Sequence, residues 1–577
     1  MNVKTRKTWL GLGGLLLVVS VIVVAFAFTS IPHSGGDNAG YVSLAHGLLT
    51  EGAYLDVFDP QRMKHTKYPP VFPGLLAMMI ALGSRTWGTL KLAAAVPTVV
   101  AVLATYVWAG RRLGAWTGFA IALILSLSSA VIYYSHWVLS DALFLAFTML
   151  ALAAFVMAEA ADFDEGAEVY SEIDRARASK AQTYTCWLVI GIAATGLAYF
   201  TRSAGLPMVF ALFSWLAISG RRRSLVISGI GLGLPMLAWW LRGRGHGVAQ
   251  YSEEFWMMNP YDPSQGTIDV IGLVPRIVEN ASIYIFQHGP AGIVGAGEGS
   301  LLLPLGLALA IAALVGWGIS VREHVGASEI FFPMYSGLIL VWPVVWAGDR
   351  FLLPLYPLIF FYGAVAIRGL NRWLSPAVTS LLGVLVLLVL LLPAVENWLD
   401  TNQESGACEL VAEERGPWAC YGARVGYFVQ AANWSSDGLP ESVSVLTRKP
   451  RHFYLLSGHS SRTFPFDGDP ETHLRLADAV GARYVLLDQW DGQAARYVGA
   501  AVNERPGAFC FVEGFGQPRD GGAQLLGILP PELRESVSSG QESVDGVQLC
   551  PESFVNPNPA GRPYRPSLRI PLLESLD

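Results

Sequence analysis

The chain has 577 residues, of which 53% are hydrophobic and only 15% charged, and its mean hydropathy is +0.42. Because this composition is too apolar for a soluble protein of this length, we expect the lipid bilayer to be its main solvent. The net charge of -6, with no basic stripe of interleaved aromatic residues, argues against nucleic-acid binding.

Hydrophobic stretches of about 20 residues, each long enough to cross a bilayer, recur along the first two thirds of the chain. The first follows a short basic segment, and because it is long for a signal peptide we expect a retained helix. The apolar run at 71–82 is too short to span, so we predict a helix in the outer interface there. We predict eleven spans, centred near residues 19, 99, 125, 148, 193, 212, 233, 310, 339, 359 and 385.

Basic residues support this threading, because the count places their clusters on one side of the membrane, as the positive-inside bias requires. The clusters are Lys4 to Lys7, Arg111 and Arg112, Arg221 to Arg223, Arg322, and Arg368 with Arg372. The N-terminus is then cytoplasmic and the C-terminus extracytoplasmic. The membrane is predicted to be the cell membrane, that is, the plasma or inner membrane. The charged loop at 159–182 is expected to be a cytoplasmic linker without a catalytic role.

The last 180 or so residues contain no further span. Short strand-like runs at 442–447, 483–488 and 524–529, with helical spacing at 470–480, indicate a small α/β domain. The sequence therefore predicts an α-helical polytopic membrane domain at 1–395, with outer loops at 30–86 and 242–299. A soluble extracytoplasmic α/β domain follows at 396–577.

Four of the five cysteines lie in this tail, which fits an oxidising compartment. Four cysteines allow three pairings, and four free thiols are the alternative. We favour pairing of sequence neighbours, Cys408 with Cys420 and Cys510 with Cys550.

Two acids stand where a charge is costly, at the outer ends of apolar segments. Asp37 lies in the glycine-rich segment 34–41, and Asp141 opens the fourth span from the same side. Such carboxylates could supply a general base that deprotonates a hydroxyl group. The alternative interpretation is that both cap helices, as Asp near a helix start often does.

Three basic residues also lie on the outer side, where the positive-inside bias disfavours them: Lys67, Arg202 and Arg350. A lipid-linked phosphate would satisfy them, since Arg offers bidentate contacts and Lys a point charge. The alternative is snorkelling to lipid headgroups, with a local pair between Asp349 and Arg350.

The order of these features resembles the GT-C glycosyltransferase superfamily. The features are a first-loop Asp with Tyr41 four residues later, Lys67-Tyr68-Pro69-Pro70, an Asp opening span four, and Arg350-Phe351-Leu352-Leu353-Pro354. Within it, residues 1–395 are similar to the branch of protein O-mannosyltransferases, lipid A aminoarabinose transferases and Rgt-like enzymes. The resemblance implies that Asp37 is the catalytic base and that Lys67 contacts the carrier phosphate.

Two departures from the family pattern affect the metal prediction. Asn38 stands where the family usually has a second acid, and Tyr68 interrupts the usual Lys-Pro-Pro. Some members hold a divalent ion with loop acids, but an amide is a poor substitute for a carboxylate toward Mg²⁺ or Mn²⁺. His136 lies five residues before Asp141, so the two do not share a helix face. We predict no tightly bound metal, with a loosely held divalent cation as the alternative.

The resulting hypothesis is an inverting transferase that moves a hexose or pentose from a polyprenyl-phosphate carrier to a glycan, lipid or protein acceptor. Asp37 and Asp141 are the candidate catalytic residues, and Lys67, Arg202 and Arg350 the candidate phosphate ligands. Tyr41, Tyr68 and His136 are supporting candidates. A transporter or flippase of an anionic substrate is the main alternative, although no hydropathy repeat is visible. An oligosaccharide polymerase or ligase is another, but it would not explain Asp37 or the α/β tail.

Overall fold

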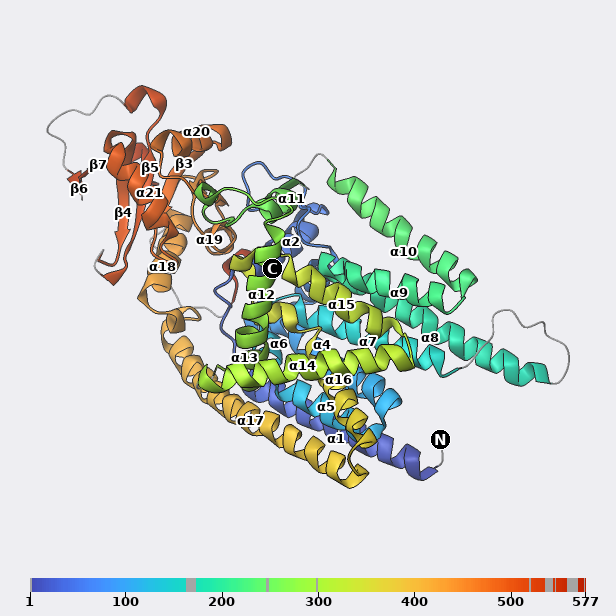
Figure 1. Ribbon diagram of the computed structural model, residues 1–577. Helices are drawn as coiled ribbons and strands as arrows, with labels where there is room; N and C mark the ends of the chain where they lie inside the picture. Colours follow the sequence, from blue (N-terminus) through green and yellow to red (C-terminus); the bar gives the residue numbers. More distant parts are fainter. Residues whose placement is uncertain are drawn as a thin grey trace.

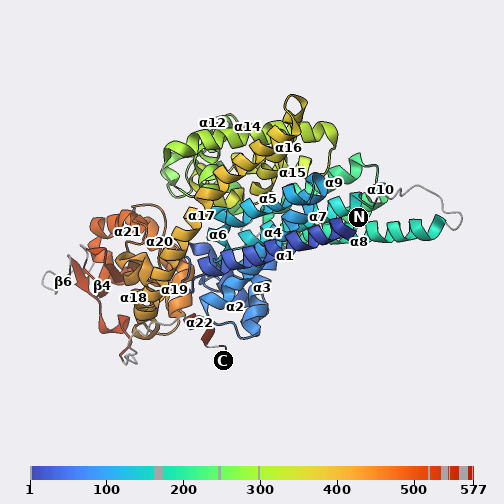
Figure 2. The ribbon, with the colours of Figure 1, turned by 90° about the horizontal axis from the view of Figure 1, so that it is seen from below.

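A computed structural model describes residues 3–161, 173–244, 249–296, 299–517, 520–534, 543–544, 546–557, 569–574 and 576. Residues 162–172 of the predicted charged loop lie outside these ranges. The described chain forms a bundle of helices with an α/β domain at the end opposite the N-terminus (Figures 1 and 2).

The helical bundle contains the predicted spans. Seven helices of the described residues are long and apolar enough to cross a membrane, and the consecutive helices α5 and α6, bent by 60°, could form an eighth span. The seven are α1 (Val3–Ala27), α4 (Trp87–Leu113), α7 (Asp141–Glu159), α8 (Ile173–Thr201), α10 (Arg222–Gly243), α14 (Gly299–Glu323) and α17 (Pro376–Arg415). The bent pair is α5 (Ala115–Leu127) and α6 (Ser129–Ser135).

Three of the eleven predicted spans correspond to shorter helices. These are α9 (Leu206–Ile218), α15 (Ala327–Leu340) and α16 (Tyr356–Gly369), of 13 or 14 residues. At 1.5 Å per residue such a helix covers about 20 Å, less than the roughly 30 Å hydrocarbon core. Helices α9 and α15 pack together, and α16 packs against α14. All eleven positions therefore carry helices, while the count of complete crossings stays a prediction.

The two loops that the sequence predicts on the outer side, called the first and second outer loops below, carry short helices of their own. The first loop forms α2 (Gly36–Glu51) and α3 (Val71–Ala81), which pack against each other. Helix α3 has only 11 residues and lies where the sequence predicted a short interfacial helix. The second loop forms α11 (Ala249–Trp256), α12 (Leu273–Ile283), the π-helix η3 (Tyr284–His288) and α13 (Gly289–Val294).

Helix α17 connects the bundle to the C-terminal domain. It runs for 40 residues without a break through the predicted domain boundary at 396, and only its first part is apolar. Figure 1 shows it along the side of the bundle and leading to the domain. Its polar end is fixed by Cys408–Cys420, one of two disulfides that confirm the predicted pairing; the other is Cys510–Cys550.

The C-terminal domain, which we define as α18 (Ala423–Gly438) onward, is the predicted α/β unit. Its seven-stranded sheet has the order β2-β1-β3-β5-β4-β7-β6 within the described residues, with β2, β1 and β3 parallel. Strands β1, β3 and β5 lie where the sequence predicted strands. The strands are β1 (Ser444–Leu446), β2 (Ser460–Arg462), β3 (Ala482–Leu487), β4 (Phe509–Phe515), β5 (Ala523–Ile528), β6 (Ser543–Val544) and β7 (Val547–Leu549).

Besides α18, this domain contains the helices α19 (Pro450–Ser457), α20 (Pro470–Val480) and α21 (Gln493–Glu504). Helix α20 matches its predicted bounds because its ends are encoded locally. The Asp469 side chain accepts hydrogen bonds from the first-turn amides, Pro470 starts the helix, and Gly481 ends it at a φ of 67°. A last short helix is α22 (Pro571–Glu574).

The two disulfides should contribute unequally to the stability of the C-terminal region. Cys510–Cys550 closes a loop of 40 residues and Cys408–Cys420 one of 12. By loop-closure entropy, removing the first pair by Cys→Ala changes should lower the free energy of unfolding by about 4 kcal/mol, and removing the second by about 3 kcal/mol. Denaturant unfolding in detergent would measure both. Equal stability of the double variant without Cys510–Cys550 and the wild type would contradict this expectation.

Candidate active site

Four of the five predicted charged residues form one chain of alternating charge. Arg350 Nη2 lies 3.0 Å from Asp37 Oδ2, and Arg350 Nε lies 3.4 Å from Asp141 Oδ1. The same oxygen of Asp141 accepts from Arg202 Nη1 at 2.5 Å. The order is therefore Asp37, Arg350, Asp141, Arg202, and we call this the charged cluster.

Each member of the cluster sits at an end or a break of a helix. Asp37 and Asp141 lie in the first turns of α2 and α7, where the helix dipole favours a negative charge. Arg202 follows α8, and Arg350 lies in the 3-10 turn η5 (Asp349–Leu352) between α15 and α16. Four separate elements therefore meet at one place.

Neither acid acts as a helix cap. The N-cap positions of α2 and α7 are Gly35 and Ser140, and neither helix has a side-chain capping hydrogen bond. Both carboxylates instead contact arginine. The capping interpretation is therefore wrong for both residues. Arg350 contacts Asp37 and Asp141, so the predicted alternative of a local pair with Asp349 is not needed; Asp349 accepts from the Tyr134 hydroxyl at 2.8 Å.

The second oxygen of Asp37 is held by another set of groups. Tyr68 donates its hydroxyl hydrogen to Asp37 Oδ1 at 2.7 Å, and Arg451 Nη1 donates to the Tyr68 oxygen at 2.7 Å. Tyr68 was a predicted supporting residue, whereas Arg451 comes from α19 of the C-terminal domain. Sequence reasoning missed Arg451, although the basic run from Arg448 directly after a predicted strand was a usable signal.

These contacts set the charge state of Asp37, which lies outside the spanning segments. Burial alone would raise the pKa of the Asp37 carboxyl. The charge of Arg350, the Tyr68 hydrogen bond and the charge of Arg451 outweigh this and hold its pKa well below the ordinary value. Asp37 is therefore ionised at neutral pH. Its side chain is 31% exposed, so part of the carboxylate is open to solvent.

Tyr41 packs beside the charged cluster. Its hydroxyl lies 2.8 Å from Ser140 Oγ, next to Asp141, and its ring packs on those of Tyr68 and Phe72. Tyr41 is buried. It therefore links α2 and α7, the two helices that present the acids.

Lys67 makes its contacts at the edge of the charged cluster. Its Nζ lies 3.3 Å from Glu254 of α11 and over the Trp346 ring at 5.7 Å. Tyr68, the next residue, contacts Asp37, and Trp346 stands four residues before Arg350. The structure thus brings Lys67 beside the cluster, paired with an acid of the second outer loop.

His136 is packed among aromatic side chains. Its Nδ1 lies 3.0 Å from the Ile132 carbonyl oxygen, and its ring contacts Tyr133 and Trp137. These contacts are those of a core histidine in the turn before α7. Its supporting role stays a prediction.

The described residues contain no group of three or more His, Cys, Asp or Glu side chains arranged to hold a metal ion. Asn38 donates its amide to the His33 carbonyl oxygen at 2.7 Å, so it orders the loop before α2. The prediction of no tightly bound metal remains open to direct measurement.

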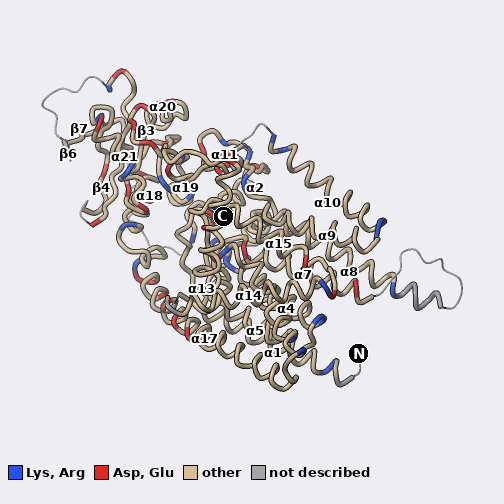
Figure 3. Tube along the Cα trace, in the orientation of Figure 1, with Lys and Arg blue, Asp and Glu red and all other residues tan. Residues whose placement is uncertain are grey.

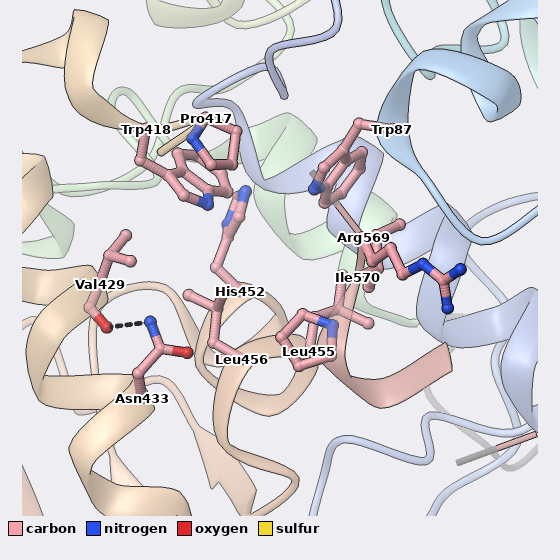
Figure 4. A pocket seen from close by; sticks show the side chains of 11 residues that line it. Trp87, Pro417, Trp418, Val429, Asn433, His452, Leu455, Leu456, Arg569 and Ile570 are labelled. Atoms are coloured by element: carbon pink, nitrogen blue, oxygen red, sulfur yellow. Dashed lines mark hydrogen bonds between the residues drawn. The ribbon is translucent and has the colours of Figure 1, made fainter. Parts of the chain in front are cut away.

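A separate pocket lies between the bundle and the C-terminal domain (Figure 4). Trp87 at the start of α4, Trp418 after α17 and His452 of α19 line it. His452 is buried, and burial and the charge of Lys449 lower its pKa to about 3, so its ring is neutral. None of the predicted site residues lines this pocket. The charged cluster, where four of the predicted site residues meet, is the candidate active site.

Breaking the pair between Asp141 and Arg202 should be costly, since their side chains are only 3% and 13% exposed. Arg202→Leu would leave a buried carboxylate with a single longer contact, so we expect a loss of about 3 to 5 kcal/mol in unfolding free energy. Adding Asp141→Asn removes the charge and should restore part of the loss. Thermal unfolding in detergent would measure both; a double variant no more stable than Arg202→Leu would contradict the pairing.

No protein-family model matches the sequence, and no curated protein does. Solved structures do match it. The oligosaccharyltransferase of Archaeoglobus fulgidus, tethered to an acceptor peptide containing the NVT sequon, is 13% identical with a TM-score of 0.52, over 89% of this chain and 74% of that chain. In complex with an inhibitory peptide and a dolichol-phosphate, that enzyme, AglB, gives 12% identity and a TM-score of 0.53 over the same shares.

A third structure, ArnT from Cupriavidus metallidurans bound to undecaprenyl phosphate, is 13% identical with a TM-score of 0.48 over 90% of this chain and 98% of that chain. All these proteins are GT-C glycosyltransferases. At such identities the likeness to the archaeal enzyme concerns the fold alone. The chain is a polytopic membrane protein with the GT-C fold.

Proposed function

We propose that this protein is a glycosyltransferase that moves a sugar from a polyprenyl-phosphate carrier to an acceptor on the outer side of the membrane. The observation that carries the proposal is the charged cluster, in which a first-loop carboxylate shares one arginine with a second acid. The archaeal neighbour was solved with a dolichol-phosphate and with an acceptor peptide, which supports a lipid-linked donor. A lipid, glycan or protein could accept the sugar.

In the proposed reaction the carrier phosphate first replaces Asp37 on Arg350. A phosphate and a carboxylate compete for the same guanidinium, because each can accept two parallel hydrogen bonds from its planar fork of N–H groups. The charge of Arg350 lowers the pKa of Asp37. When the Arg350 guanidinium pairs with the phosphate instead, the pKa of Asp37 rises and Asp37 becomes a stronger base. Donor binding thus activates the base only when the leaving group is in place.

Transfer is then a single displacement. The acceptor hydroxyl gives its proton to Asp37 as its oxygen bonds to the anomeric carbon. The bond from that carbon to the phosphate oxygen breaks, and the electron pair stays on the phosphate. Arg350 and Arg202 stabilise the charge of the leaving phosphate, and Lys67 joins them when it leaves Glu254. One displacement inverts the anomeric centre.

Asp37→Asn should separate binding from chemistry. The amide cannot take the proton, so transfer should fall by about 10² or more. Because Asn does not compete for Arg350, undecaprenyl phosphate should bind at least as tightly as to the wild type. Release of carrier phosphate from a polyprenyl-phosphate sugar, and binding of undecaprenyl phosphate, would be measured in detergent.

Two further variants complete this experiment. Arg350→Leu should weaken binding of undecaprenyl phosphate by about 1.5 to 3 kcal/mol, as loss of a charged hydrogen bond does. Glu51→Gln is the matched control, since Glu51 is a first-loop acid at the other end of α2 from Asp37 and pairs with Arg62. Near-normal transfer by Asp37→Asn would move the base elsewhere and refute the mechanism.

We also propose that the protein lies in the cell membrane (plasma or inner membrane), with the N-terminus cytoplasmic and the C-terminal domain extracytoplasmic. Arg111 and Arg112 lie in the last turn of α4, and Arg322 lies in the last turn of α14. Asp141 is the first residue of α7, at the opposite end of the bundle. Figure 3 shows several Lys and Arg residues close to the N-terminus, at the end of the bundle away from the C-terminal domain. This distribution follows the positive-inside bias.

The orientation can be tested with reporters fused after Asp577. A reporter active only in the periplasm or outside the cell should be active, and one active only in the cytoplasm should be silent. The opposite pattern would place the charged cluster on the cytoplasmic side and contradict the orientation.

A further inference from the structure

We infer that Arg451 of the C-terminal domain is a positioning residue for Asp37, acting through the hydroxyl of Tyr68. The inference deepens the proposed function and rests on it for the role of Asp37 as base. It means that part of the catalytic apparatus comes from the C-terminal domain.

The direction of the hydrogen bonds supports this role. A guanidinium can only donate, so Arg451 Nη1 makes the Tyr68 oxygen an acceptor. The single hydrogen of that hydroxyl is then available for Asp37 Oδ1 at 2.7 Å. Arg451 therefore fixes which way Tyr68 donates, and Tyr68 fixes one oxygen of the carboxylate.

The two oxygens of Asp37 are consequently held by different parts of the molecule. Oδ2 faces Arg350 of the bundle, and Oδ1 faces the Tyr68–Arg451 pair. When the phosphate takes Arg350, Oδ2 is released to accept a proton while Oδ1 stays bound. The carboxylate thus keeps its orientation during the step that activates it.

The residues around Arg451 hold its guanidinium next to Tyr68. Its guanidinium stacks over the rings of Tyr68 and Phe58, at 5.2 and 5.4 Å. A Cβ at Gly40 of α2 would lie 2.9 Å from Arg451 Nη1, so a larger residue there would push the guanidinium aside. Helix α19 packs directly against α2.

The C-terminal domain also docks on the first outer loop through β2. The backbone amide of Ser461 donates to the Phe58 carbonyl oxygen at 2.7 Å, and Arg462 donates to Gln61 at 2.7 Å. The backbone contact of Ser461 holds β2, which packs against α19, on the loop that carries Tyr68. Arg462 touches the same loop without reaching Tyr68, so it provides a matched control.

The test reads the protonation of Asp37 directly. A water-soluble carbodiimide modifies protonated carboxyl groups, and mass spectrometry of the Asp37 peptide gives the pH midpoint of labelling. Removing a cation that stabilises the ionised form raises a pKa. Arg451→Met should therefore move the midpoint to higher pH by about one pH unit, while Arg451→Lys and Arg462→Met should leave it near the wild-type value.

Other charged groups near Asp37 are common to all variants. Arg350 of η5 contacts it directly, Asp141 of α7 shares that arginine, and Tyr68 donates to it. His33 lies beside it, and burial and the charge of Arg350 lower the pKa of His33 to about 4. Comparing midpoints between variants cancels their contribution.

Gly40→Ala provides a second variant should Arg451→Met fail to fold. The added methyl displaces the end of a flexible side chain and keeps its charge. We expect a smaller shift of the midpoint in the same direction. An unchanged midpoint in both variants, or an equal shift in Arg462→Met, would overturn the inference.

Kinetics separate this role from a merely structural one. With a polyprenyl-phosphate sugar as donor, Arg451→Met should lower kcat about 10- to 100-fold, as misplacing a catalytic group does, with little change in KM for the donor. Arg451→Lys should restore part of kcat. If the wild type shows no transfer, the proposed function fails, whereas the labelling midpoints still decide whether Arg451 positions Asp37.

Discussion

Arg350 is the residue on which the rest of the site depends, because one guanidinium contacts two carboxylates from different helices. Its Nη2 pairs with Asp37 at 3.0 Å and its Nε lies 3.4 Å from Asp141. Charges at this depth are tolerated only with partners, so the first outer loop, α7 and the turn before α16 must meet at this point. The arginine thereby organises the end of the bundle that faces the C-terminal domain.

The same interaction accounts, in the proposed mechanism, for the use of a carboxylate of low pKa as the base. In the unliganded protein Asp37 is paired, fully ionised and a weak proton acceptor. An anion that takes Arg350 removes the strongest of the stabilising charges. In the proposed mechanism the affinity of Arg350 for phosphate is therefore coupled to the basicity of Asp37, so that donor binding precedes deprotonation of the acceptor.

Much of this could be predicted from sequence because the relevant signals are local. Asp37, Asp141, Arg202 and Arg350 stood out because each is costly at a membrane end, and they do form one cluster. Helix α20 carries its own start and stop residues, and β1, β3 and β5 follow from short apolar runs. Arg451 could not be placed, because its contact with Tyr68 joins residues 383 apart and depends on how the C-terminal domain docks. The pairing of Lys67 with Glu254 is equally long-range, and helix length alone does not establish the number of crossings.

The central claim is that carrier phosphate and Asp37 compete for Arg350. The most direct measurement is the pH midpoint of carbodiimide labelling of Asp37 in the wild-type protein, with and without saturating undecaprenyl phosphate. If the phosphate draws Arg350 away, the midpoint should rise when the lipid is bound. An unchanged midpoint with the lipid demonstrably bound would contradict the account.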